Sequence, residues 1–380
     1  MHVAQINFLP VPKDLAHAAV LEQWHSLVDI AEVAAHGGSR VSVVQAAARD
    51  ELVTRNGIDY HFVAVDAAGT PARRRRRSFA GPLAGRLAEI RPDVMHAHGL
   101  GFAGDAFAVS RCLPRLPILV QDHADRPPRW WRRPQWRRWY AAVAGVAFTA
   151  SDLAQPFIRD GLFGPHPRVF AIPESSTRFT PGDRECARAG TGLHGDPCVL
   201  WVGHLSRHKD PLSVLEGVAQ ASSRLPRLQL WCAFGDAPLL ETMQVRIERD
   251  ARLAGRVHLL GKIAHPHVQS MMRAADLFVS GSHAESCGYA VLEALACGLL
   301  PVVTDIPSFR ALTGNGRVGH LWPCGDAARL AAALVEAAAG PPSAAQVRAH
   351  FEATLSFAAV GRQWAAAYAQ VRDAHPRSRP

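Results

Sequence analysis

The chain has 380 residues, which is enough for two domains of ordinary size. Its content of 48% hydrophobic and 20% charged residues is typical of a folded globular protein and excludes a disordered chain. The formal net charge is +9, and arginine supplies almost all of the positive charge, because only Lys13, Lys209 and Lys262 are lysines. Such a bias is typical of genome composition, and an anionic partner is the alternative explanation.

Seven cysteines are scattered along the chain without a C-x-x-C pair, a pattern that predicts a reducing compartment and no disulfide framework or zinc knuckle. Lys13, Asp14 and Glu22 interrupt the apolar run that a signal peptide would need. The longest uncharged stretch, residues 139–151, is shorter than the roughly 18 residues of a membrane span. We therefore expect a cytoplasmic protein, with peripheral contact at the inner face of the membrane as a further expectation.

Short apolar runs alternate with helical patterns through the first half of the chain. Residues 15–35 and 78–90 carry apolar side chains at helical spacing and are predicted to be helices. The runs predicted to be strands are 3–9, 40–46, 58–65, 93–98, 117–123, 143–149 and 168–173. Strands that alternate with crossover helices predict an α/β protein with a doubly wound parallel sheet.

The alternation stops in a segment rich in Ser, Thr, Gly, Pro and charge and then restarts, which predicts two domains. We assign residues 1–175 to an N-terminal Rossmann-like domain, 176–197 to a linker and 198–355 to a C-terminal Rossmann-like domain. Residues 356–373 are expected to form a helix that returns to the N-terminal domain, and 374–380 to form a tail. The predicted strands of the second half are 199–202, 228–234, 257–260, 277–280 and 300–304. Ligands of such sheets bind beyond the carboxyl ends of the strands.

The most informative stretch follows the strand that ends at Ser280. A loop of small residues leads to a helix that begins near Gly288, and the unpaired amides at such a helix start suit a diphosphate. Glu285 lies in the loop, and Glu293 lies eight residues later in the helix, where two acceptor oxygens suit a vicinal diol. Alternatively, the two glutamates are solvated or helix-capping carboxylates, or the acid and nucleophile of a glycosidase.

This stretch resembles the E-x7-E signature of retaining glycosyltransferases of the glycosyltransferase-B (GT-B) fold, family four, with mild departures at Cys287 and Tyr289. The resemblance implies two Rossmann-like domains facing across a central cleft, with the nucleotide-sugar bound by the C-terminal domain and the acceptor by the N-terminal domain, residues 1–175. It implies that Glu293 binds the ribose and that Glu285 lies near the hydroxyls of the transferred sugar. Sugar and phosphate would meet the amides of Cys287, Gly288 and Tyr289. The matching positions are Glu285, Gly288, Leu292, Glu293, Ala294, Ala296, Gly298, Pro301, Val302 and Val303.

A second match opens the C-terminal domain. Residues 200–210 read as a strand, a turn at Gly203 and a helix start, and they resemble the family element in which an arginine and a lysine clamp the leaving diphosphate. Lys209 matches, whereas His204 stands where the arginine is expected. A neutral imidazole donates one hydrogen bond, whereas an arginine carries a permanent charge and can donate two parallel hydrogen bonds. Three explanations remain: phosphates hold His204 protonated, Arg207 substitutes for it, or donor activation is weaker.

Residues 257–262 resemble the family strand whose following loop meets the nucleobase, so Gly261 and Lys262 are counted as donor-binding residues, with surface solvation as the alternative for Lys262. In the first half, His123 ends a strand and matches a family histidine that contacts the donor sugar from the acceptor side. A strand-end hydrogen bond is the alternative. Residues 9–15 contain no glycine where family members commonly carry a Gly-Gly pair, so acceptor handling is expected to differ.

Two basic tracts remain. One runs from Arg73 to Arg77, and the other, from Arg126 to Tyr140, interleaves tryptophans with arginines. They are solvated loops or they contact an anionic membrane surface. No helix-turn-helix, RNA-recognition or zinc-finger pattern supports nucleic acid.

The expected function is transfer of a sugar, with retention, from a nucleotide-diphosphate-sugar to an unknown carbohydrate, lipid-linked or small-molecule acceptor. His123, Glu285 and Lys209 are the expected catalytic residues. No D-x-D pair occurs, so we expect neither a metal nor another cofactor, and the nucleotide-sugar is a substrate. The alternatives are a catalytically weak nucleotide-sugar-binding protein and, less favoured, a basic nucleic-acid-binding protein.

Overall fold

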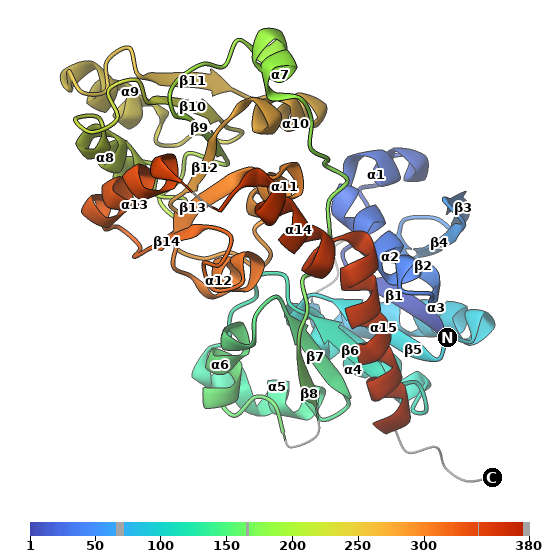
Figure 1. The fold of residues 1–380 in the computed structure, drawn as a ribbon. Coiled ribbons are helices and arrows are strands. Elements are labelled where there is room, and N and C mark those ends of the chain that lie inside the picture. The colour runs from blue at the N-terminus through green and yellow to red at the C-terminus, as the bar shows by residue number, and fades with distance from the viewer. Residues whose placement is uncertain (66–71, 165–166, 341, 375–380) are drawn as a thin grey trace. The chain divides into compact units, whose positions relative to one another are not determined.

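The computed structural model describes residues 1–65, 72–164, 167–340 and 342–374, without the side chains of His25 and of residues 72–77. The chain divides into two compact units (Figure 1). The first contains residues 1–176 together with the segment that begins at Phe357, and the second contains Thr177–Ser356. Among the described residues, no helix combines the length and the apolar character that crossing a bilayer requires.

The first unit is built on an eight-stranded sheet of order β3-β4-β2-β1-β5-β6-β7-β8. All neighbouring pairs are parallel except β3 and β4, a hairpin that the sequence analysis missed. Its turn, Asn56-Gly57, has positive φ angles of 52° and 75°, the conformation that an Asn-Gly hairpin adopts easily. The strands are β1 His2–Asn7, β2 Arg40–Ala47, β3 Glu51–Arg55, β4 Ile58–Ala64, β5 Val94–His98, β6 Ile118–Gln121, β7 Gly145–Phe148 and β8 Arg168–Ala171.

Helices cover both faces of this sheet. Helices α3, α4 and α5 pack over one hydrophobic core, and α1, α2 and α15 over another. The single helix predicted over 15–35 is wrong, because the chain breaks at Trp24 (φ −97°, ψ 68°) into α1 and α2. The helices are α1 His17–Gln23, α2 His25–His36, α3 Ala72–Ile90, α4 Ala103–Cys112, α5 Arg133–Tyr140, α6 Ser151–Arg159 and α15 Phe357–Ala374, with 3-10 turns η1 Leu100–Phe102 and η2 Trp130–Arg132.

Helix α15 follows the second unit in sequence but belongs to the first. It lies so close to α2 that a Cβ on Gly361 would come within 2.5 Å of the Val33 carbonyl oxygen. Trp364 and Tyr368 are buried in the core, and the Tyr368 hydroxyl lies 2.8 Å from Nδ1 of His96 on β5. The helix is therefore an integral layer of the first unit.

The second unit has a six-stranded parallel sheet of order β11-β10-β9-β12-β13-β14 around one hydrophobic core. Helices α8 and α13 pack together on one side of the sheet, and α10 and α11 lie on the other (Figure 1). The strands are β9 Cys198–Val202, β10 Gln229–Ala233, β11 Val257–Gly261, β12 Leu277–Ser280, β13 Leu300–Thr304 and β14 His320–Trp322. The helices are α7 Arg184–Thr191, α8 Pro211–Ala221, α9 Leu240–Arg249, α10 His265–Ala274, α11 Tyr289–Cys297, α12 Pro307–Thr313, α13 Ala327–Ala339 and α14 Ala344–Thr354.

The segment predicted as a linker, 176–197, is instead largely part of the second unit. It contains α7, which packs against α10, and Arg184 and Arg188 of α7 pair with Asp276 at 2.9 and 2.7 Å. Its polar composition reflects a solvent-facing helix held by ion pairs, which local sequence does not distinguish from a linker. Of the predicted tail, 375–380 lie outside the described residues.

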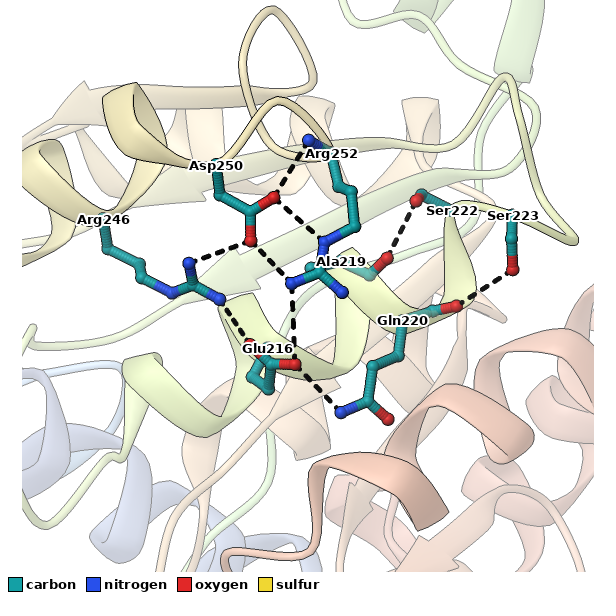
Figure 2. A network of polar contacts seen from close by, with 8 residues as sticks. All are labelled: Glu216, Ala219, Gln220, Ser222, Ser223, Arg246, Asp250 and Arg252. Atoms are coloured by element: carbon teal, nitrogen blue, oxygen red, sulfur yellow. Dashed lines mark hydrogen bonds and ion pairs between the residues drawn. The ribbon is translucent and has the colours of Figure 1, made fainter.

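A network of polar contacts ties α8 to α9 and to the turn before β11 (Figure 2). Arg246 of α9 pairs with Glu216 of α8 and, at 2.9 Å, with Asp250. Arg252 closes the network by pairing with Asp250 at 2.7 Å and lying 3.7 Å from Glu216. Because Asp250 is buried, these arginines satisfy a carboxylate that would otherwise be costly to fold.

Candidate active site

The carboxyl ends of the parallel strands in the second unit lie at one edge of its sheet. The strand order reverses at β9, which lies between β10 and β12, and such a reversal forms a crevice for ligands. The loop after β9 carries Gly203, His204 and Lys209, and the loop after β12 leads to Glu285 and Gly288. Topology alone thus brings the two sequence-matched elements to the same crevice.

Lys209 and Glu285, predicted from motifs far apart in the sequence, form an ion pair in the structure. The Lys209 ammonium group donates to Oε1 of Glu285, and the Ser282 hydroxyl donates to the same oxygen at 2.7 Å. Both charged side chains are partly buried. An ammonium group is therefore held at this sheet edge by a carboxylate that is itself fixed by a hydroxyl.

The two loops that carry this pair are pinned together. A Cβ on Gly281 would lie 2.8 Å from the Asp210 carbonyl oxygen and 3.0 Å from that of Lys209. The His283 amide donates to the His208 carbonyl oxygen, and the His283 ring lies 2.9 Å from the Asp210 carboxylate. The sequence analysis missed the roles of Gly281 and His283, although a glycine directly after a strand signals a close backbone approach.

Gly288 is the N-cap of α11, in the left-handed conformation (φ 78°). A Cβ there would also lie 2.7 Å from the ring of Phe309, so both conformation and space require glycine. No side chain caps α11, and its N-terminal dipole points into the loop that holds Glu285. The arrangement suits a diphosphate, as the sequence predicted. Cys287, directly before Gly288, is fully buried, and Tyr289 begins the helix.

Glu293, 7% exposed on α11, has a partner of its own. Its Oε1 accepts a hydrogen bond from Nε2 of His265 at 2.6 Å, and His265 begins α10 just after β11. Within the described part of the chain, Oε2 of Glu293 has no partner, so it can accept from a ligand. Sequence reasoning did not identify His265, because no motif marks it.

The structure shows how the ring of His204 is held. Its Nδ1 accepts a hydrogen bond from the Asp236 amide at 3.0 Å. Nε2 of this half-exposed ring is the nitrogen left to donate to a ligand. Arg207, the other explanation, is exposed.

Gly261 and Lys262 lie at the end of β11. Gly261 has a φ of 74°, and its carbonyl oxygen accepts from the Phe234 amide at 2.8 Å. Lys262 is exposed and makes no ion pair with any residue in the described ranges. Both residues therefore lie at the same sheet edge as Gly203, on the far side of β10.

His123 lies in the first unit, just after β6. Its Nδ1 is 3.1 Å from the buried carboxylate of Glu174, and its Nε2 is 3.1 Å from Nδ1 of His98. Burial by itself lowers the pKa of His123, but the hydrogen bond and charge of Glu174 outweigh burial, and the pKa is raised. Burial lowers the pKa of His98 well below its usual value. His123 therefore links a carboxylate to a second histidine.

Two α/β units, each built on a largely parallel sheet, form the architecture of the GT-B fold. Residues 183–351 match the family described as Glycosyl transferases group 1. The predicted resemblance to this family, the fold class of two Rossmann-like units and the assignment as a glycosyltransferase are confirmed.

Relatives and solved structures agree with this assignment. The chain is 28% identical over 335 residues to D-inositol 3-phosphate glycosyltransferase of Rhodococcus erythropolis, covering 75% of each chain. It is 27% identical over 236 residues to GDP-mannose:cellobiosyl-diphosphopolyprenol alpha-mannosyltransferase of Xanthomonas campestris, covering 59% of each. Sucrose-phosphate synthase from Thermosynechococcus elongatus has a similar fold (TM-score 0.68, 17% identity, 97% and 98% of the two chains). So does Anabaena Alr3699/HepE in complex with UDP and glucose (TM-score 0.66, 19% identity, 97% and 99%).

Proposed function

We propose that the protein transfers a sugar from a nucleoside-diphosphate sugar to a hydroxyl group, with retention of configuration and without a metal. The observation that carries this proposal is the partly buried Lys209–Glu285 pair beside the uncapped start of α11. It combines a fixed cation with a helix N-terminus, the two groups that stabilise a departing diphosphate.

In the proposed step, the bond between the anomeric carbon and the donor phosphate oxygen breaks, and a bond from that carbon to the acceptor oxygen forms on the same face. The acceptor's hydroxyl proton passes to the leaving phosphate, so nucleoside diphosphate and glycosylated acceptor are the products. Negative charge grows on the diphosphate, where Lys209 and the amides of α11 stabilise it. His204, held through Nδ1 by the Asp236 amide, adds one hydrogen bond from Nε2.

The two glutamates have different parts in this proposal. Before the donor binds, Glu285 neutralises Lys209. The diphosphate then competes for the ammonium group, and the freed oxygen of Glu285 accepts from a sugar hydroxyl. Glu293, held through Oε1 by His265, offers Oε2 to the ribose. A glycosidase would need both carboxylates beside one scissile bond, and the separate partners of Glu285 and Glu293 do not favour that reading.

The proposed setting is the cytoplasm, with contact at the inner face of the membrane. The name of the Xanthomonas campestris relative includes a polyprenol-linked acceptor, and the Anabaena structure is a complex with UDP. Of the two basic tracts, the one from Arg126 to Tyr140 is described and largely exposed, whereas the side chains from Arg73 to Arg77 lie outside the described residues.

The test is nucleoside diphosphate release from a panel of UDP-, GDP- and ADP-sugars, with and without EDTA. We expect release with one nucleotide, insensitivity to EDTA, and loss in Glu293→Ala and Lys209→Ala. The anomeric configuration of the product, read by NMR, tests retention. A donor that raises the melting temperature without release would indicate a binding protein, and steeply salt-dependent oligonucleotide binding would indicate a nucleic-acid-binding protein.

A further inference from the structure

A pocket of about 520 Å³ lies entirely within the first unit, at the carboxyl ends of β1, β5 and β6. The strand order of this sheet reverses at β1, so the pocket occupies the position where an open parallel sheet binds a ligand. Its volume is in the range of small-molecule sites. The lining residues are Asn7, Leu9, Gln23, Trp24, Ser26, Leu27, Ile30, His98, Gly99, Phe102 and His123.

Most of the lining is apolar. Leu27 and Ile30 lie three residues apart on one face of α2, Trp24 stands at the break between α1 and α2, and Leu9 and Phe102 come from loops. Leu9 is 53% exposed, although it belongs to the loop where family members commonly carry glycines.

The polar groups of the pocket include the His98–His123 pair. Glu174 holds His123, which in turn lies within hydrogen-bond distance of His98, so this end of the pocket is a fixed polar position. Asn7, Gln23 and Ser26 add polar groups to the lining. A sugar chain that lay along Leu27, Ile30 and Phe102 would nevertheless bury hydroxyls against apolar side chains, which is costly. A molecule with a polar head and an apolar body fits both parts.

The segment that leaves the pocket wall at His123 exposes aromatic side chains and unpaired charge. Trp130 and Trp131 are 72% and 51% exposed and pack edge to face, and the Arg129 guanidinium lies over Trp131. In the described part of the chain, four arginines of this segment make no ion pair: Arg126, Arg129, Arg132 and Arg138. Exposed indoles among unpaired arginines match the interface of an anionic bilayer, where Trp rings lie at the head-group level.

We propose that the acceptor is an amphiphile taken from an anionic membrane surface. Its apolar body occupies the first-unit pocket, its hydroxyl-bearing head lies at His98 and His123, and the segment from Arg126 to Tyr140 holds the protein on the bilayer. This proposal rests on the proposed function, because it names the acceptor of the same transfer.

Isothermal titration calorimetry with two detergent-type probes tests the pocket. Octyl β-D-glucoside, below its micelle concentration, and methyl β-D-glucoside share one head and differ only in the tail. We expect the octyl compound to bind at least about tenfold more tightly, because each buried methylene adds affinity. Ser26→Trp, which fills the pocket from its exposed rim, abolishes the difference, whereas Leu52→Ala, at a 58%-exposed position on β3, keeps it. Equal binding of the two probes, or an octyl preference that survives Ser26→Trp, overturns the pocket assignment.

Sedimentation with vesicles tests the surface. We expect the full chain to bind vesicles of phosphatidylcholine with phosphatidylglycerol, weakly at high salt, and not vesicles of phosphatidylcholine alone. Trp130→Ala/Trp131→Ala removes most of this binding with an unchanged melting temperature, and Leu52→Ala removes none. Full binding by the double variant overturns the membrane assignment.

Neither experiment requires turnover, so the amphiphile acceptor is tested independently of the proposed transferase function. If both predictions fail while donor-dependent nucleoside diphosphate release persists and is lost in Glu293→Ala, the amphiphile acceptor is wrong and the transferase stands. If no donor in the panel supports nucleoside diphosphate release, the proposed transferase function is wrong. The pocket and the exposed tryptophan–arginine segment would then have a binding role only.

Discussion

The two units share an architecture but differ in what their sheet edges offer. Both place residues at the carboxyl ends of parallel strands where the order reverses, at β1 in the first unit and β9 in the second. The crevice of the second unit is lined by a charged pair, a helix N-terminus and two loops pinned through Gly281. The pocket of the first unit is walled by apolar side chains with a histidine pair. The strand order of the sheet determines where a ligand site lies, and the loops at that edge determine which chemical groups line it.

Replacing Lys209 with alanine is the strongest test of the charged half of this comparison. We expect nucleoside diphosphate release to fall by about 100- to 1,000-fold, because the transition state loses a fixed cation and Glu285 is left without its partner. Steady-state kinetics measure the effect. Lys13→Ala, at an exposed lysine of the first unit, is the control and should change the rate little. A comparable loss in both variants would contradict the assignment.

The pinning of the two loops is tested by Gly281→Ala. The new Cβ would meet two carbonyl oxygens at 2.8 and 3.0 Å, so we expect the free energy of unfolding to fall by about 1–3 kcal/mol and activity to fall with it. Urea denaturation gives the value. Gly190→Ala, in α7 with open space around its Cβ, should be neutral or slightly stabilising. Equal stability of the two variants would show that the loops are not held by this contact.

His265 is expected to orient Glu293 for the donor. Its loss in His265→Ala should raise the KM for the donor by about tenfold with a smaller change in kcat, because one hydrogen bond to a carboxylate is removed. His265→Gln, which can still donate, should recover most of the affinity. A pure loss of kcat, or no recovery in the glutamine variant, would argue against orientation of Glu293.

The smallest effect is expected in the first unit, from Glu174→Gln. Removing the carboxylate should lower the pKa of His123, because Glu174 is what raises it against burial. A histidine whose pKa is higher in the folded state stabilises the native protein fully at pH values below its unfolded-state pKa of about 6.5. This stabilisation is lost as the pH rises through the folded-state pKa. The variant should therefore be about 1 kcal/mol less stable near pH 6 and closer to wild type at pH 8. Melting curves measure the stability of the variant, and NMR titration measures the pKa of His123. An unchanged pKa would show that Glu174 does not raise the pKa of His123.

The elements that sequence predicted best are those fixed by local chemistry. The strand, the small-residue loop and the helix start at Gly288 follow one another directly, and the positive φ of Gly288 is a local requirement. The pairing of Lys209 with Glu285 was predictable only in outline, from a family resemblance that placed both on the donor. The individual roles of these residues remain predictions.

The features that sequence missed depend on contacts between distant residues. His265 meets Glu293 because α10 and α11 pack together, and no local pattern reports that packing. Trp24 breaks a segment whose helical periodicity is continuous, and the break supplies a wall of the pocket. Helix α7 looked like a linker because its polar face is satisfied by Asp276, far along the chain.

The position of α15 has a consequence for synthesis. The second unit is contiguous in sequence, whereas the first needs α15 to cover α2 and to bury Trp364 and Tyr368. On the ribosome, Thr177–Ser356 can complete its core while the earlier half still waits for a layer that has not been made. The part of the protein that is translated first is therefore the last to finish folding, and until then the apolar face of α2 is a target for chaperones.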